Sequence, residues 1–279
     1  MAKIHVRVAA QTDVGKVRTR NEDGFVVSDL SGKVRGGESL TGRFEVGEEG
    51  VLLAVSDGMG GAQAGDLASA LVLHTLERAM ALKTGAPSAA RVVGAVQDAH
   101  RRVFEAARAE GIRMGATLTA VYIHGAQAFI AEVGDSRAYL IRSGRIVRLT
   151  HDQSMVQSLI DAGVVAADNP DQPFRNVILQ AMGHQENVKV ALGQLELRLR
   201  DCLVLCSDGL TIYVSDEEIR SVVLGAPSLD AACNSLVALA NARGGNDNVT
   251  VLAAGVGGEL QLPVEPIEST QQVLASFAE

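Results

Sequence analysis

The segment 51–61, VLLAVSDGMGG, is an apolar run that ends in Ser-Asp-Gly at residues 56–58. A second segment, 202–210, has the same layout as CLVLCSDGL, with Ser-Asp-Gly at residues 207–209. Short apolar runs bounded by glycine and aspartate predict buried strands, so each segment places a carboxylate where a strand ends. Asp-Gly is a common turn dipeptide, and one copy alone would indicate only a turn. Two matched copies favour a shared role for Asp57 and Asp208.

Three more aspartates occupy the same kind of position beside predicted strands: Asp23, Asp135 and Asp247. Carboxylates that are crowded together resist ionisation unless a cation compensates their charge. Hard divalent ions such as Mg²⁺ and Mn²⁺ prefer carboxylate, carbonyl and water oxygens. The five aspartates therefore predict a metal cluster.

Two residues near these aspartates add to the predicted site. Gly58 follows Asp57 and has no Cβ, so its carbonyl can approach an ion closely. Arg18 lies five residues before Asp23, and its planar guanidinium matches two phosphate oxygens. A single arginine in such a segment is more often an ordinary surface residue, so its role depends on the rest of the site.

Predicted strands and helices do not alternate strictly along the chain, a pattern typical of an α+β fold. The apolar runs predict strands at 4–9, 25–27, 51–55, 116–123, 128–133, 137–141, 203–206 and 249–256. Helical patterns cover 67–82, 89–109, 155–162 and 230–242, and a capping box of Ser215 and Glu218 predicts a further helix start. Because helices come in adjacent pairs and Ser143-Gly144 predicts a hairpin, we expect a two-sheet antiparallel β-sandwich flanked by helices on both sides, in four α-β-β-α layers.

Several segments predict irregular structure. Residues 31–50 are rich in glycine, serine and charge and predict a surface loop, and residues 168–173 contain two prolines. Residues 258–279 are polar with a short apolar end and predict a C-terminal tail after a single domain at 1–257.

Composition restricts the function classes. The 279 residues are 47% hydrophobic and carry a formal charge of −8, which disfavours nucleic acid as a partner. There is no apolar run of membrane-spanning length and no secretory signal pattern, so we expect a cytoplasmic protein with no membrane partner. Cys202, Cys206 and Cys233 form no CxxC pair and are predicted to be buried and reduced.

Seven segments in order carry a resemblance to a known family: TDVGKVRTRNED, VSDGMGG, GATLTAVYI, EVGDSRAYL, LTHDQSMVQSLIDAGVV, LCSDGLT and GGNDNVTV. Together they resemble the metal-dependent protein serine/threonine phosphatases, the protein phosphatase 2C-like family in its bacterial form. The match runs from about Gln11 to Gly255, and an ordered series of this kind is far more specific than any single motif. The resemblance implies a sandwich of two antiparallel sheets with a two-metal site at one end and a variable flap at about 151–183.

The resemblance also implies roles for the aspartates. Asp57 would bridge two core ions, Mn²⁺ or Mg²⁺, and would be both a metal ligand and a catalytic residue. Asp208 and Asp247 would complete the first ion, and the Gly58 carbonyl with Asp23, acting through water, would serve the second.

Further residues match the family pattern or depart from it. Asp135 matches the position that helps to hold a third, weaker ion, and Arg18 matches the catalytic arginine that binds the substrate phosphate. Glu22 matches the motif without an assigned role. Relatives often carry histidine where this chain has Ala62, so the preferred proton donor is a metal-bound water, with His151 or His184 as the alternatives.

The predicted function is therefore hydrolysis of phosphoserine and phosphothreonine on proteins by a metal-activated water. The predicted partners are phosphorylated proteins, including a cognate serine/threonine kinase, and we expect a monomer. One alternative is a catalytically weak regulator of the same fold that binds phosphoproteins. A phosphatase with an aspartyl nucleophile is disfavoured because Met59 occupies the position of its second aspartate. The acidic balance and the full motif series disfavour a metal-dependent nuclease or small-molecule phosphoesterase.

Overall fold

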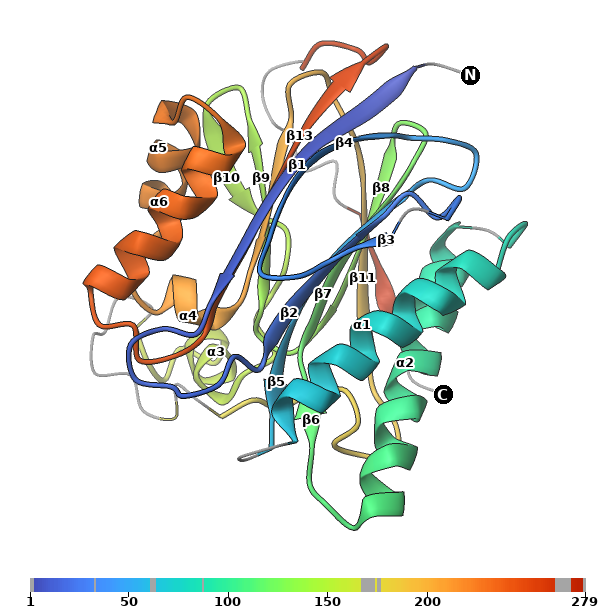
Figure 1. The fold of residues 1–279 in the computed structure, drawn as a ribbon. Coiled ribbons are helices and arrows are strands. Elements are labelled where there is room, and N and C mark those ends of the chain that lie inside the picture. Colours follow the sequence, from blue (N-terminus) through green and yellow to red (C-terminus); the bar gives the residue numbers. More distant parts are fainter. Residues whose placement is uncertain are drawn as a thin grey trace.

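Two antiparallel sheets packed face to face form the framework of the protein, with helices on both outer faces (Figure 1). The computed structural model describes residues 3–32, 34–60, 64–86, 88–166, 174, 177–263 and 272–277. Every strand pairing in these ranges is antiparallel.

The first sheet has six strands within the described residues. Their order across the sheet is β10 (Arg145–Arg148), β9 (Arg137–Arg142), β12 (Cys202–Cys206), β13 (Val249–Gly258), β1 (Ile4–Asp13) and β4 (Ser39–Glu45). The turn between β9 and β10 has positive φ at both Ser143 and Gly144, as a two-residue hairpin requires, so the predicted hairpin is confirmed.

The second sheet has eight strands in the part of the chain that is described. Seven of them follow the order β14 (Gln272–Phe277), β11 (Val190–Glu196), β8 (Gln127–Val133), β7 (Leu118–His124), β5 (Val51–Met59), β2 (Asp23–Ser28) and β3 (Val34–Arg35), and the short β6 (Gly115–Ala116) pairs with the end of β5.

The helices cover the two outer faces. On the second sheet lie α1 (Gly65–Leu82) and α2 (Ser88–Glu110); on the first lie α5 (Asp216–Gly225) and α6 (Leu229–Ala242), after the single turn α4 (Asp208–Thr211). The short α3 (Met155–Asp161) follows β10. Ser215 accepts a hydrogen bond from the Glu218 amide, and the Glu218 side chain accepts one from the Ser215 amide, so the predicted capping box is present at the start of α5.

Alternation along β1 shows how the layers are built. Ile4, Val6 and Val8 belong to the core between the sheets, whereas Ala9 faces the helical layer. Separate apolar clusters lie under α1 and α2 and under α5 and α6. The predicted α-β-β-α sandwich is confirmed.

The structure corrects the prediction of a surface loop at 31–50. Residues Ser39–Glu45 form β4, which pairs with β1, and Val34–Arg35 form β3. In β4 only Phe44 is buried, because the strand is at the edge of its sheet and one face is open to solvent. An edge strand of this kind lacks the apolar pattern on which the prediction depended.

Two further segments differ from expectation. β11 is a strand that the apolar pattern did not reveal, since Gly193 and Gln194 interrupt it. In the predicted tail, Gln272–Phe277 is the strand β14, which pairs with β11. Within the described residues, no helix is long and apolar enough to cross a membrane.

Candidate active site

The predicted site begins where β2 and β5 pair. Asp23 on β2 lies directly opposite Asp57 on β5. Asp23 is also tied to the other sheet, because its Oδ2 accepts hydrogen bonds from Ser207 Oγ at 2.7 Å and from Thr250 Oγ1 at 2.8 Å. Acidic residues from distant parts of the chain are thus brought to one end of the sandwich.

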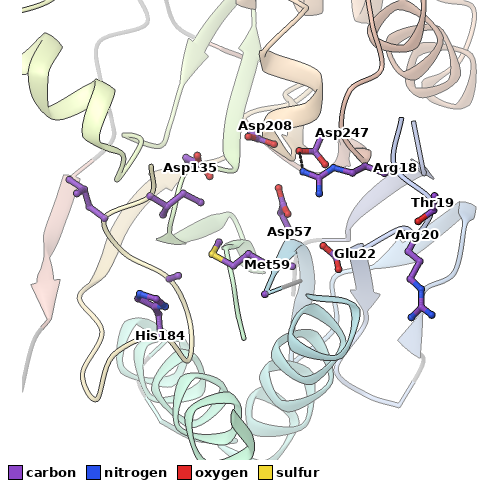
Figure 2. Close-up of a pocket in the computed structure, with 15 residues that line it drawn as sticks. Arg18, Thr19, Arg20, Glu22, Asp57, Met59, Asp135, His184, Asp208 and Asp247 are labelled. Carbon is purple, nitrogen blue, oxygen red and sulfur yellow. Dashed lines mark hydrogen bonds and ion pairs between the residues drawn. The ribbon is translucent and has the colours of Figure 1, made fainter. Parts of the chain in front are cut away.

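A pocket of about 550 Å³ opens at this end. Its lining contains nearly all of the predicted metal-binding and phosphate-binding residues: Arg18, Asp57, Gly58, Asp135, Asp208 and Asp247 (Figure 2). Glu22, Arg20 and Met59 also line it. Asp23 is the predicted ligand that does not line the pocket, and it lies behind Asp57 in the sheet.

Two carboxylate oxygens of the site are buried without a hydrogen-bond partner among the described residues, Asp23 Oδ1 and Asp208 Oδ1. A buried carboxylate oxygen without a partner is costly, and a hard cation is the partner that suits it. No three Asp, Glu, His or Cys side chains in the described ranges form a ready-made metal cage. The donor set fits divalent cations in its chemistry, although its acids are not gathered into a closed cluster.

The electrostatics of the aspartates support the same conclusion. Burial, together with the charges of neighbouring aspartates, raises the pKa of Asp23 to about 7 and that of Asp208 to about 6. Burial and then Asp208 raise the pKa of Asp135 to about 8. Burial, followed by the charges of Asp23 and Asp208, raises the pKa of Asp57 well above its ordinary value. A cation would lower these pKa values, and its binding would release protons.

Arg18 reaches into the pocket from the loop before β2 and donates a hydrogen bond to Asp247 Oδ2 at 2.8 Å (Figure 2). The two side chains are 51% and 31% exposed, so the ion pair is worth little and is easily exchanged for other partners. The pocket therefore combines an anion-binding arginine with a group of acids, as phosphate chemistry on divalent ions requires.

The family model of protein phosphatase 2C matches residues 16–158. The chain belongs to the protein phosphatase 2C family. A putative protein phosphatase 2C-type protein of Streptococcus pyogenes serotype M6 is 31% identical over 252 residues, which cover 88% of this chain and 96% of that protein. The serine/threonine protein phosphatase PstP of Mycobacterium tuberculosis is 35% identical over 90% of this chain and 45% of its own length.

Solved structures also support membership of this family. The crystal structure of the Mycobacterium tuberculosis phosphatase PstP/Ppp has a TM-score of 0.77 at 35% identity, with 90% of this chain and 98% of that chain covered. The catalytic domain of PstP in complex with two manganese ions has a TM-score of 0.76 at 34% identity, with 91% and 99% covered. The predicted family and enzyme class are therefore confirmed: the chain is a protein phosphatase.

The position of Arg18 in this phosphatase depends on a residue that sequence reasoning missed. Asn248 is buried, and its amide nitrogen donates hydrogen bonds to the carbonyls of Val14 at 2.9 Å and Arg20 at 2.8 Å. Its amide oxygen accepts one from the Glu22 backbone at 2.8 Å. Asn248 thus fixes both ends of the loop that carries Arg18. The available signal was its place directly after Asp247.

The flap and the histidines are only partly described. Ile178 and Leu179 of the predicted flap line the pocket, whereas residues 167–173 and 175–176 lie outside the described residues, as does Ala62. His184 is the one histidine in the described ranges that lines the pocket. His151 does not line it, and its Nε2 is hydrogen-bonded to Asp161 at 2.7 Å.

Proposed function

We propose that this phosphatase hydrolyses phosphate esters of serine and threonine side chains in proteins with the help of two divalent cations, Mn²⁺ or Mg²⁺. The observation that carries the proposal is the convergence of Asp57, Asp208 and Asp247 on one pocket together with Arg18. The serine/threonine specificity of the relatives and the manganese ions in the PstP complex support it.

The residues that would hold the ions follow from their placement. Asp57 projects into the pocket between Asp208 and Glu22 in Figure 2, and it would be shared by both ions. Asp208 and Asp247 would hold one ion, and the Gly58 carbonyl the other. Asp23 lies behind Asp57 and would act through water. Asp135, at the pocket wall, would help to hold a third, weaker ion.

When bound, the two cations supply the positive charge that makes water a nucleophile at neutral pH and offsets charge on the phosphoryl oxygens. The protein orients the substrate. Arg18 would bind two phosphate oxygens through its planar guanidinium, in exchange for its hydrogen bond to Asp247. Because that ion pair is half exposed, the exchange costs little.

The leaving serine or threonine alkoxide must gain a proton. His184 lines the pocket and is the histidine best placed to supply it, directly or through water. His151 is less suited, because its ring is held by Asp161 outside the pocket. A His184→Gln variant that keeps the wild-type pH profile of kcat would exclude His184 and leave water as the donor.

A phosphoprotein-binding regulator of the same fold would use the same arginine but would not turn over. The discriminating experiment offers the purified protein phosphothreonine and phosphotyrosine peptides of matched sequence, with Mn²⁺ and with chelator. We expect repeated turnover of the phosphothreonine peptide with Mn²⁺ only, and none by the Asp57→Asn variant. Binding without turnover in every condition would establish the regulator instead.

The physiological substrates are proposed to be phosphorylated proteins, including a serine/threonine kinase of the same cell. The autophosphorylated kinase, offered under the same conditions, should lose its phosphothreonine signal. A kinase that keeps its phosphate while the peptide is hydrolysed would remove this partner from the proposal.

A further inference from the structure

A second pocket, of about 720 Å³, lies on the outer face of the first sheet, beside the connection between α5 and α6. Among the described residues it shares no lining residue with the active site. The start of α6 lines it, and the other end of α6 precedes the loop of Asp247, so the helix separates the two pockets by about 20 Å. This second pocket is not part of the phosphatase site.

The floor of this pocket follows from strand alternation. Val6 and Val8 face the core between the sheets, so His5 and Arg7 face outward. Their partners on the neighbouring strand β13 are Gly257 and Gly255, which have no side chains to fill the space. Glycine in a strand interior often marks a place where another group approaches closely, and here His5 lies over Gly257 and Leu229 over Gly255.

One side of the pocket is cationic. Arg7 lies directly opposite Arg43 on β4, and like charges in this arrangement repel. Arg43 is paired with Glu45 at 2.9 Å, whereas Arg7 and Arg200 have no ion pair with a carboxylate in the described part of the chain. His5 lies over Gly257 beside these arginines.

Acidic residues at the pocket cancel only part of this charge. Asp201 is buried and forms an ion pair with Arg142 at 2.7 Å, so it is already compensated. Asp230 accepts hydrogen bonds from Thr41 and Asn234 at the start of α6. With Arg43 paired to Glu45 and Asp201 paired to Arg142, Arg7 and Arg200 face one carboxylate, that of Asp230, which has no cationic partner among the residues described, so the pocket keeps a small excess of positive charge.

The opposite side is apolar. Leu224 at the end of α5, Pro227 in the connection and Leu229 at the start of α6 line it, and Leu224 is 51% exposed. Leu229 packs over Gly255, where a Cβ would lie 3.5 Å from its Cδ1. Apolar walls with a few convergent polar groups in a cavity of this size are typical of small-molecule sites.

We propose that this pocket binds a small organic anion, with its phosphate, sulfate or carboxylate group at Arg7 and Arg200 and its apolar body against Leu224 and Leu229. The anion compensates the charges of Arg7 and Arg200, and the apolar body covers Leu224, which is otherwise exposed to water.

The test uses 8-anilinonaphthalene-1-sulfonate, which joins an aromatic body to one sulfonate, and follows its fluorescence with the full chain. We expect the Arg7→Gln/Arg200→Gln double variant to bind it about tenfold more weakly, since two charge-assisted contacts are lost. The neutral analogue N-phenyl-1-naphthylamine should bind both proteins equally. The matched control is Arg102→Gln, an exposed arginine on α2, which should change nothing.

A second measurement locates the probe. Amide chemical shifts in ¹⁵N-labelled protein should move at Gly255 and Gly257, and a phosphopeptide with Mn²⁺ should not displace the probe. Unchanged affinity in a folded double variant, shifts centred on Asp57 and Asp208, or displacement by the phosphopeptide would each overturn the proposal.

Discussion

The two Ser-Asp-Gly tripeptides, at 56–58 and 207–209, are identical in sequence and differ in structure. The first stays within β5, where Asp57 pairs with β2 and Gly58 with β6. The second lies between β12 and α4, and Asp208 is the first residue of α4. The Ile212 amide donates a hydrogen bond to the Asp208 carbonyl and so closes this helical turn. Both present a carboxylate at the same pocket. The apolar run before each tripeptide determines that it is buried, whereas the neighbouring strands determine whether its backbone continues a strand or begins a helix.

The serines of the two tripeptides show the same contrast. Ser56 Oγ donates a hydrogen bond to the Thr117 carbonyl at 2.7 Å, beside its own strand. Ser207 Oγ instead donates to Asp23 Oδ2, on the other sheet, at 2.7 Å. The second tripeptide therefore joins the two sheets beneath the active site, which the first does not.

The glycines of the two tripeptides, Gly58 and Gly209, are both in close contact with a neighbouring backbone segment. A Cβ at Gly58 would lie 2.0 Å from the Gly65 carbonyl oxygen, and one at Gly209 would lie 1.9 Å from that of Asn248. Both copies therefore need glycine for close backbone approach, in a strand and in a helix alike.

The largest expected effect comes from neutralising the aspartate of either tripeptide. Asp57→Asn and Asp208→Asn should each lower kcat with a phosphothreonine peptide on the order of a thousandfold or more, since each removes a proposed cation ligand. Thermal unfolding without cation should show both variants folded, because asparagine removes a buried carboxylate. Glu105→Gln, on exposed α2 surface, is the control. Full activity in either aspartate variant would refute the metal assignment.

Next is the pH dependence of the metal-free protein. The folded pKa of Asp208 is raised to about 6, and that of Asp57 is raised well above its ordinary value. Groups with raised folded pKa values bind more protons in the folded state, so the free energy of unfolding should fall as pH rises through about 6 and beyond. Urea denaturation with chelator at about pH 5 to 8 measures this.

The carboxyl ¹³C signal of Asp208 under the same conditions should show ionisation near pH 6, above the ordinary range, because burial and the charge of Asp247 raise its pKa. Saturating Mn²⁺ should remove the fall in stability, since bound ligands are already ionised. A metal-free protein that becomes more stable over this range would contradict the raised pKa values.

A smaller effect is expected at Arg18, on the Asp208 side of the pocket. Arg18→Ala should raise KM for a phosphopeptide about tenfold and leave Mn²⁺ affinity unchanged or higher, because Asp247 loses its competing partner. Arg18→Lys keeps the positive charge but lacks the planar guanidinium, so its KM should lie between those of the wild type and Arg18→Ala. Calorimetry and steady-state kinetics test both. Lost metal binding with unchanged KM is the opposite pattern and would assign Arg18 to the cation site.

The smallest expected effects come from removing the hydroxyl of either tripeptide serine, Ser56 or Ser207. Ser207→Ala should destabilise the protein by about 1–2 kcal/mol and weaken Mn²⁺ binding, because Asp23 loses a donor. Ser56→Ala should cost about 1 kcal/mol and leave Mn²⁺ binding unchanged, since its bond goes to a carbonyl. Equal effects on Mn²⁺ affinity would show that the two copies do not differ in this way.

Much of the fold could be predicted because its buried strands and capped helices are encoded locally. The apolar runs located β5, β12 and β13, and the capping box located α5. The edge strand β4 could not be found, because six of its seven residues are not buried and its pairing with β1 is a long-range contact.

The site was predictable for a different reason. Asp57 and Asp208 follow apolar runs that must be buried, so their position at strand ends is a local property. Asn248 was missed because the three hydrogen bonds of its side chain go to residues more than two hundred positions away.

By itself the sequence determined the family, the sandwich of sheets and helices, and the residue types gathered for phosphate chemistry, because periodicity and ordered motifs carry that information along the chain. Only the tertiary structure decided that Arg18 holds Asp247, that Ser207 ties Asp23 across the sheets, and that Arg7 and Arg200 meet at a second pocket. The physical reason is that these contacts join residues far apart in sequence, and strand pairing and sheet packing bring them together.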